Sequence, residues 1–200
     1  MTVDRRALLL HTIAGVAATP LLTASPPAQA VGVTEPRQGW AHKDGRIAMH
    51  APSTVTAQRD PMAYLLLHEA LSRYGIAHDE LRFDVLSELF TDDALLEVGK
   101  GSGTPFQTVR GSRAIVANFA NVLGQQGDQR RHCFTNVVID HLDEGTAKML
   151  AYGLVSVAAD GLTLGATVFY QADCQKVAGN WRFTRLFIGM DDYTTPAPKV

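Results

Sequence analysis

The chain has 200 residues, of which 46% are hydrophobic and 19% are charged. This balance allows a sizeable buried core and excludes a wholly disordered chain. The formal net charge is −2, and no cluster of Lys and Arg alternates with aromatic residues, so the sequence does not indicate nucleic-acid binding.

The first thirty residues have the pattern of an export signal. Arg5-Arg6 lies in a short charged start, residues 7–22 are largely apolar, and Ala28-Gln29-Ala30 is typical of a signal-peptidase site. The apolar stretch is too short and broken for a stable membrane span. We expect residues 1–30 to be removed and the protein to be exported, periplasmic or extracellular, in a bacterium, with no membrane association afterwards. The arginine pair favours the twin-arginine route over an ordinary secretory signal.

Residues 31–59 are rich in Pro, Gly and His and show no sustained periodicity. We interpret them as an extended N-terminal segment, either a linker or a strap lying over the domain. A compact domain is expected over residues 60–192, and residues 193–200 are expected to form a flexible tail.

Three helices are predicted in the first half of this domain. The first begins at Asp60 and Pro61, a helix cap followed by proline at the first helical position. Its apolar side ends with Tyr74, and Gly75 is expected to loosen the helix end. Two more helices follow, with these apolar stripes: Phe83, Leu86, Leu89 and Phe90 for the second, and Ile115, Phe119 and Val122 for the third, over residues 112–124.

The remaining periodic segments alternate as strands do. They cover residues 94–98, 107–110, 132–140, 146–158, 164–176 and 181–190. Helices followed by a four-strand meander predict an α+β fold, with the helices packed on one face of an antiparallel sheet. Cys133 and Cys174 are too few for a disulfide framework, and we expect both to be free and buried.

Five short motifs occur in the order that is typical of the SnoaL-like branch of the nuclear-transport-factor-two-like superfamily. They are Arg73-Tyr74 with Asp79, Asp84 with residues 89–94 (LFTDDA), residues 111–115 (GSRAI) with Phe119, residues 131–136 (RHCFTN), and residues 179–183 (GNWRF). The match runs in order over about residues 63–188, and the chain therefore resembles this family, which includes polyketide cyclases, scytalone dehydratase and ketosteroid isomerase.

The resemblance implies a cone-shaped, curved antiparallel sheet of about six strands, wrapped by three helices and enclosing a pocket for a small apolar molecule. It implies no cofactor. In relatives the outer face of the sheet mediates a homodimer, and alternation along the strand places Cys133, Val137 and Ile139 on that face. The alternative is that the N-terminal strap covers it.

The sequence departs from the family pattern in the last two strands. The acid expected two residues after Tyr170 comes one place late, at Asp173, so alternation turns it to the opposite face. The arginine of the last strand is displaced to Arg185. Scytalone dehydratase uses two pocket histidines on its sheet, and here only His132 is placed to face the pocket.

His132, Asp79 and Tyr74 are the candidate catalytic residues. Imidazole is the natural proton shuttle near neutral pH, although His132 could instead be a core histidine that bonds a backbone carbonyl. Asp79 would orient the imidazole, or else cap the second helix. The Tyr74 hydroxyl would donate to a substrate oxygen, or the ring could simply pack in the core.

Four residues are assigned to substrate binding: Asn136, Phe134, Tyr170 and Phe119. Asn136 could equally make an interstrand hydrogen bond. His78, next to Asp79, is expected to face solvent. No metal-ligand spacing or phosphate-binding loop in a strand-to-helix context is present, so no metal is predicted.

Two functions fit these residues. The first is a cofactor-independent lyase or isomerase (a dehydratase, double-bond isomerase or cyclase) that abstracts a proton from a small carbonyl-bearing substrate. The second is a non-catalytic, exported protein that binds a small ligand with the same fold. Hydrogen-bond contact between His132 and Asp79, inside a pocket that Tyr74 also faces, would favour the first.

Overall fold

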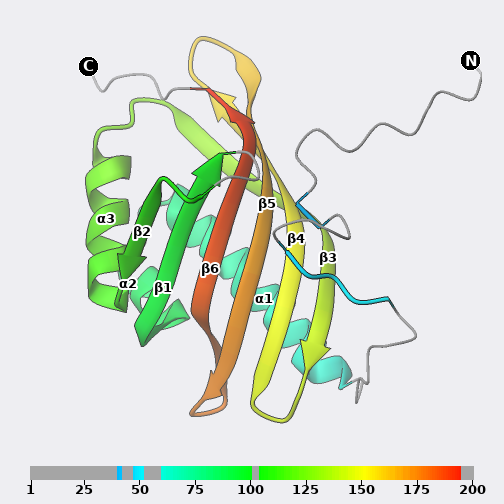
Figure 1. The fold of residues 1–200 in the computed structure, drawn as a ribbon. Coiled ribbons are helices and arrows are strands. Elements are labelled where there is room, and N and C mark those ends of the chain that lie inside the picture. The colour runs from blue at the N-terminus through cyan, green and yellow to red at the C-terminus, as the bar shows by residue number, and fades with distance from the viewer. Residues whose placement is uncertain (1–39, 42–46, 52–59, 101–103, 195–200) are drawn as a thin grey trace, which may run out of the picture. The chain divides into compact units, whose positions relative to one another are not determined.

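The computed structural model describes residues 40–41, 47–51, 60–100 and 104–194, all within the unit formed by residues 35–200 (Figure 1). The predicted signal peptide and most of the predicted linker and tail lie outside these residues. Among the described helices, none combines the length and apolar character that a membrane span requires.

Three helices are described: α1 (Pro61–Asp79), α2 (Phe83–Leu89) and α3 (Ser112–Gly124). Helix α1 begins as predicted, because the Asp60 side chain accepts a hydrogen bond from the Met62 backbone N–H and Pro61 takes the first helical position. The helix was predicted to end near Gly75, but it continues to Asp79. Gly75 is instead a point of close approach, because a Cβ there would lie 2.6 Å from Cε2 of Phe134.

Six strands form one sheet in the order β2-β1-β6-β5-β4-β3. Their bounds are β1 Phe90–Lys100, β2 Gln107–Arg110, β3 Gln129–Leu142, β4 Thr146–Ala158, β5 Leu162–Val177 and β6 Asn180–Tyr193. The α+β prediction is confirmed, with one difference in the sheet. Strand β1 pairs with β6 in parallel, so the sheet is mixed rather than wholly antiparallel. Because β1 and β6 are far apart in sequence, their pairing is not limited to the antiparallel geometry of a hairpin.

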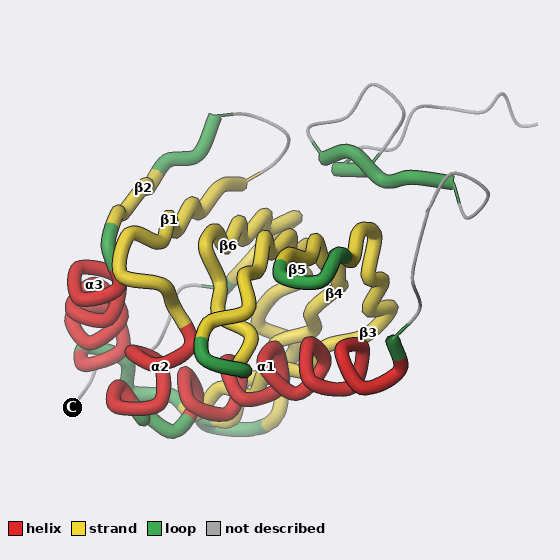
Figure 2. The backbone as a smooth tube through the Cα atoms, turned by 90° about the horizontal axis from the view of Figure 1, so that it is seen from below, coloured by secondary structure: helices red, strands yellow, loops and turns green. Residues whose placement is uncertain are grey.

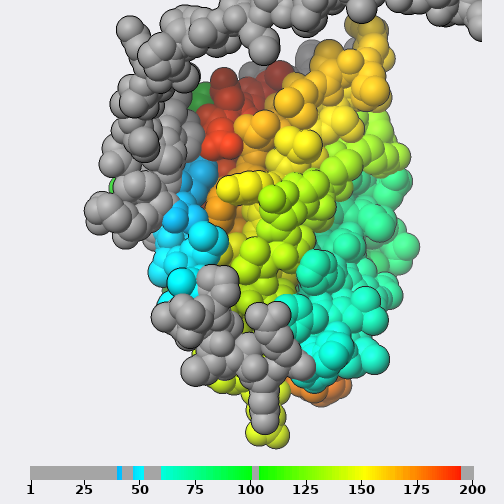
Figure 3. Space-filling model, turned by 90° about the vertical axis from the view of Figure 1, so that its right-hand side faces the viewer, coloured from blue at the N-terminus to red at the C-terminus, as the bar shows by residue number. Residues whose placement is uncertain are grey.

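The two faces of the sheet have different coverings. Helix α1 crosses one face and α3 flanks β1 and β2, while the segment 47–51 lies across the opposite face (Figures 1 and 2). We call the α1 side the inner face and the other the outer face. The space-filling view onto the β3 edge of the sheet shows the same layers, with residues 40–41 and 47–51 on one side of the sheet and α1 on the other (Figure 3).

The outer face carries its own small apolar cluster beneath the N-terminal segment. The members of this cluster are Trp40, Ile47, Leu150, Phe169 and Phe187. The Trp40 ring meets Phe187 edge-on with centroids 5.6 Å apart, and its indole N–H donates to Asp191 at 2.8 Å. Residues 40 and 47 of the predicted strap therefore cover part of the face on which a homodimer was also predicted.

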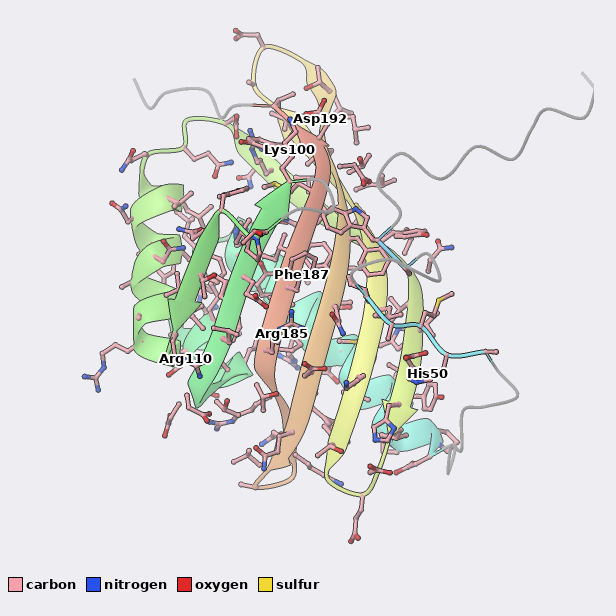
Figure 4. All side chains as sticks on the ribbon, viewed as in Figure 1. His50, Lys100, Arg110, Arg185, Phe187 and Asp192 are labelled. Atoms are coloured by element: carbon pink, nitrogen blue, oxygen red, sulfur yellow. The ribbon has the colours of Figure 1, made fainter. Side chains whose placement is uncertain are left out.

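A contact between His50 and Asp140 attaches residues 47–51 to strand β3. The Asp140 carboxylate accepts from the His50 backbone N–H at 2.8 Å and lies 2.7 Å from its Nδ1. The Asp140 side chain is only 2% exposed. Figure 4 shows His50 on the outer side, beside β3.

A bulge in β3 changes which residues face inward. The register shifts between Thr135 and Val138, and Asn136 adopts a left-handed backbone with φ of 52°. Ile139 is consequently buried in the inner core, with Val137 packed against it. The prediction that Val137 and Ile139 lie on the outer face was wrong, because an inserted residue resets the alternation.

Both cysteines are free, as predicted, but their burial differs. Cys174 is buried on the inner face of β5, where burial raises the pKa of its thiol to about 12. Cys133 is exposed, so the prediction that both cysteines are buried was wrong for Cys133.

Candidate active site

A small cavity of about 200 Å³ lies between α1, α3 and the inner face of the sheet. Most of its wall is apolar. The lining residues are Tyr74, His78, Val98, Gln107, Asn118, Phe119, Val122, Leu123, Gln126, Arg130, His132, Val155, Ala166, Val168, Tyr170, Ile188 and Met190. Three predicted site residues besides His132 are therefore on this wall, namely Tyr74, Phe119 and Tyr170.

His132 is on the cavity wall and forms a close pair with Asp79, which is not itself a lining residue. Asp79 is the last residue of α1, and His132 lies on β3, which packs against that helix. The Asp79 carboxylate accepts from the His132 backbone N–H at 2.7 Å and lies 2.5 Å from its Nδ1. The two side chains are 5% and 9% exposed. Asp79 does not cap α2, whose cap position is Arg82.

This contact fixes the state of both groups. An ionised carboxylate can only accept, so Nδ1 of His132 carries the proton of this hydrogen bond, and in the neutral imidazole Nε2 then has the lone pair. Burial disfavours the charged form of Asp79, but hydrogen bonds from His132 and the proximity of His78 outweigh it and hold the pKa of Asp79 well below its usual range. The pair is thus an ionised orienter holding an imidazole in one tautomer.

Tyr74 and Tyr170 bring two phenol groups to the same cavity. Both rings are buried, with exposures of 1% and 2%, and their centroids lie 6.4 Å apart. Burial raises the pKa of both hydroxyls above the usual value of tyrosine. Both phenols are on the cavity wall, so both can donate to a molecule bound there.

His78 also lines the cavity, which corrects the prediction that it faces solvent. It lies one turn after Tyr74 on the same side of α1, and its side chain is 14% exposed. Its ring meets the His132 ring edge-on with centroids 4.7 Å apart. The prediction failed because the helix was ended at Gly75, whereas the i, i+4 spacing would have placed His78 beside Tyr74.

The other predicted binding residues divide between the two faces. Phe119 lines the cavity, whereas Phe134 is not on its wall and packs behind it, against Tyr170 with ring centroids 5.0 Å apart. Asn136 does not reach the cavity at all. The bulge turns it to the outer face, where it lines a groove of about 660 Å³ together with Tyr152 and Met49.

Polar residues that the sequence did not single out form part of the cavity wall. Gln107 donates to Asn118 at 2.9 Å, which joins β2 to α3. Arg130 donates to Asp128 at 3.0 Å, and Gln126 donates to the same carboxylate at 2.9 Å. Nothing in the local sequence marks these residues, because their meeting depends on how α3 and the start of β3 fold against each other.

The displaced acid and arginine of the last two strands meet on the outer face. Arg185 donates to Glu97 at 2.7 Å and to Gln171 at 3.2 Å, and lies 3.7 Å from Asp173. Figure 4 shows Arg185 and Phe187 on the side of β6 that is turned away from α1. The predicted change of face is confirmed, and neither Asp173 nor Arg185 contributes to the cavity.

One group of described residues has the geometry to hold a metal ion. His78, Asp79 and His132 offer ligand atoms that all lie within 4.8 Å of one another. In the present arrangement Nδ1 of His132 is engaged with Asp79, whereas Nδ1 of His78 is buried without a partner and lies 3.7 Å from Asp79.

Comparison with known proteins agrees with this fold. The SnoaL-like domain family matches residues 63–186. No curated protein shows significant similarity to the chain.

Solved structures share the fold at low sequence identity. A Mycobacterium tuberculosis protein of unknown function is 19% identical to this chain, with a TM-score of 0.58. The superposition covers 66% of this chain and 74% of that protein. Two proteins of Novosphingobium aromaticivorans are also similar. The β subunit of a provisionally assigned aromatic-ring-hydroxylating dioxygenase is 16% identical over 69% of this chain and 97% of its own, with a TM-score of 0.60. A provisionally assigned scytalone dehydratase is 17% identical over 70% and 94%, with a TM-score of 0.56. Because the SnoaL-like domain family matches residues 63–186, which are most of the domain, the chain belongs to the SnoaL-like family.

Proposed function

We propose that the protein is a cofactor-independent lyase or isomerase that removes a proton beside a carbonyl group of a small apolar substrate. The observation that carries this proposal is the contact between His132 and Asp79 at the wall of an apolar cavity. A histidine whose Nδ1 is held by a buried carboxylate is prepared to accept a proton at Nε2.

The chemical step uses three groups of the cavity. Nε2 of His132 takes the proton from carbon, the C–H electron pair moves toward the carbonyl, and negative charge collects on the carbonyl oxygen. Asp79 stabilises the resulting imidazolium. The hydroxyls of Tyr74 and Tyr170 supply hydrogen bonds to that oxygen, and removing one such donor typically lowers a rate by about 10²–10³-fold.

The apolar wall strengthens these interactions and limits the substrate. Few water molecules compete inside such a cavity, so charge–dipole contacts act at low dielectric. A volume of about 200 Å³ lies below the roughly 300–1,000 Å³ of most ligand pockets, which favours a compact molecule. Dehydration, double-bond shift and cyclisation all begin with this proton abstraction, and all remain within the proposal.

The first test compares the chain from Val31 onward with two variants, His132→Ala and the matched control His141→Ala. His141 is an exposed histidine paired with Asp143, away from the cavity. Each protein is incubated with extract from the producing organism, and metabolites are compared by mass spectrometry. A compound changed by the wild type and the control, but spared by His132→Ala, supports turnover. A compound changed equally by all three proteins would contradict the proposal.

A second candidate function is non-catalytic binding of a small ligand. It is favoured by the position of Arg185, Glu97 and Asp173, whose charges lie on the outer face and leave the cavity without the family's usual acid. A compound that co-purifies equally with the wild type and His132→Ala, without chemical change, would support this function instead. For either function we propose export. We also propose an assembly of two copies through the part of the outer face that residues 40–41 and 47–51 leave open.

A further inference from the structure

His78, Asp79 and His132 meet at the boundary between the apolar cavity and a second, polar pocket. The two histidines are on the cavity wall, whereas His78 and Asp79 line the polar pocket, which has a volume of about 180 Å³. Leu81 and Gln129 on the wall of this pocket are exposed, so the pocket opens to the surface. A path from solvent therefore leads to the three residues without passing through the apolar cavity.

The ligand atoms of this group have nearly the spacing that a bound transition-metal ion requires. Two ligand atoms on one tetrahedral Zn²⁺ lie about 3.4 Å apart, because each metal–ligand bond is about 2.1 Å long. Nδ1 of His78 lies 3.7 Å from Oδ1 of Asp79, and all three ligand atoms lie within 4.8 Å of one another. Nδ1 of His132 lies 2.5 Å from the same oxygen. This hydrogen bond would lengthen by about 1 Å when an ion takes the place of its proton.

Nδ1 of His78 is the atom that points to a ligand. It is buried and has no hydrogen-bond partner among the residues that the structure describes, because Asp79 is too far away at 3.7 Å. A buried nitrogen without a partner costs free energy, and a bound metal ion would remove that cost. The carboxylate is already oriented, since its Oδ2 accepts from the His132 backbone N–H at 2.7 Å. Arg130, a cation on the same pocket wall, is paired with Asp128 at 3.0 Å, which offsets its charge.

We propose that His78, Asp79 and His132 bind a divalent transition-metal ion such as Zn²⁺, which inhibits the proposed reaction. Two imidazoles and one carboxylate are ligands that Zn²⁺ takes, with water from the polar pocket as the fourth ligand. The inhibitory part of this inference rests on the proposed function. With the metal on Nδ1 of His132, the single proton of the neutral ring is on Nε2, so that nitrogen cannot accept a proton from substrate. Metal binding itself does not depend on the protein being an enzyme.

A second His–Asp contact, on the outer face, lacks a third ligand. Nδ1 of His50 lies 2.7 Å from the Asp140 carboxylate, but within the described part of the chain this pair belongs to no group of three possible ligands. His50→Ala is therefore the matched control, because it removes an equally direct His–Asp contact without removing a ligand of the proposed site.

The first experiment measures metal binding directly. The protein is purified without a histidine tag, treated with chelator and titrated with Co²⁺, which absorbs visible light when it is held by four ligands. We expect one Co²⁺ per wild-type chain, displaced by Zn²⁺, and binding that is weaker by about tenfold or more in His78→Gln and in His132→Ala. His50→Ala should bind as the wild type does.

Circular dichroism checks the fold of each variant, and the two ligand variants test the site independently of each other. No absorption band in the wild type, or equal binding by all four proteins, would overturn the site.

The second experiment measures the effect of Zn²⁺ on the proposed reaction. The probe is 2-tetralone, a small apolar ketone with acidic C–H groups, and its deuterium uptake in D₂O is followed by proton NMR. Saturating Zn²⁺ should lower the enzyme-dependent exchange rate of the wild type and of His50→Ala by about tenfold or more. It should have little effect on His78→Gln. The rates with and without Zn²⁺ are compared within each protein, so a change in a variant's own rate does not affect the result.

The outcomes separate the two proposals. Co²⁺ binding that depends on His78 and His132, without exchange above that of metal-free His132→Ala, would support the metal site but contradict the proposed base, and the inhibition with it. Binding accompanied by exchange that Zn²⁺ leaves unchanged would overturn the inhibitory role. Exchange that depends on His132, in a protein that binds no metal, would overturn this inference and leave the proposed function standing.

Discussion

Gly75 lies so close to the Phe134 ring that a Cβ added to the glycine would be 2.6 Å from Cε2 of Phe134. The same Cβ would be 3.3 Å from Cβ of His132. The glycine therefore sets the distance between α1 and β3, the two elements that carry Asp79 and His132. This close approach lets the Asp79 carboxylate, at the helix end, reach the backbone N–H and the ring Nδ1 of His132.

Gly75→Ala is expected to lower the free energy of unfolding by about 1–3 kcal/mol, because the helix and strand must separate to admit the methyl group. Denaturant titration measures the change. Gly124→Ala is the matched control, since nothing lies within 4 Å of a Cβ at this helical position. Alanine there should be neutral or stabilise by up to about 1 kcal/mol. Equal effects at the two positions would contradict the close-packing role of Gly75.

Asp79→Asn is expected to destabilise the protein in a pH-dependent way. Because the pKa of Asp79 in the folded state lies below its unfolded value near 3.9, the ionised carboxylate stabilises the fold above that pH. This stabilisation is lost as pH falls through the folded pKa. The free-energy difference between wild type and variant should be about 1–3 kcal/mol at pH 7 and shrink below about pH 4. A difference that is constant from pH 7 to pH 2 would contradict this linkage.

Tyr74→Phe should separate ligand chemistry from stability. The hydroxyl is part of the cavity wall, so its removal should leave the free energy of unfolding unchanged within about 0.5 kcal/mol or raise it slightly. The same variant should slow the enzyme-dependent deuterium exchange of 2-tetralone, a small apolar ketone with acidic C–H groups, by about tenfold or more, as followed by proton NMR in D₂O. Exchange at the wild-type rate would remove Tyr74 from the proposed mechanism.

Trp40→Ala is expected to lower the free energy of unfolding by about 2–4 kcal/mol, because it opens the outer cluster and leaves Asp191 without the indole donor. Met49→Ala, at a position 56% exposed on the same segment, is the control and should change stability by less than about 0.5 kcal/mol. If both variants unfold like the wild type, the segment does not stabilise the sheet.

The two cysteines should react at different rates with a thiol reagent such as DTNB at pH 8. Cys133 is exposed and should react in the folded protein, whereas Cys174 is buried and has a raised pKa, so it should react only after unfolding. The expected stoichiometry is one thiol in buffer and two in denaturant. Cys133→Ser should abolish the reaction of the folded protein, and a remaining fast thiol would contradict the described burial.

Local sequence signals predicted the elements well where turn chemistry marks their ends. The strand at residues 146–158 and the helix at 112–124 have the bounds that Gly and Asp residues beside them indicate. The end of α1 was missed because a glycine in a helix has two interpretations, a stop or a close contact. Only the position of Phe134 in space distinguishes them.

The site was predictable to the extent that it follows from family motifs. The resemblance singled out His132, Asp79 and Tyr74; His132 and Tyr74 are on the cavity wall, and Asp79 contacts His132. Asn136 was misplaced because strict alternation cannot reveal an inserted residue, and the bulge is set by the pairing of β3 with β4. His78 was missed as a result of the shortened helix, which shows how an error in an element boundary becomes an error in the site.

One arrangement occurs twice in this molecule. Asp140 takes the backbone N–H and approaches the ring nitrogen of His50, as Asp79 does with His132. At His50 this contact attaches residues 47–51 to β3, and 54% of the His50 side chain is exposed to solvent. At His132 the same contact holds a ring that is 9% exposed and borders the apolar cavity. The same His–Asp contact is therefore a candidate reaction centre only at His132, where the ring lies at the wall of a mostly apolar cavity. The proposed activity therefore depends on the apolar wall as well as on the histidine and the aspartate.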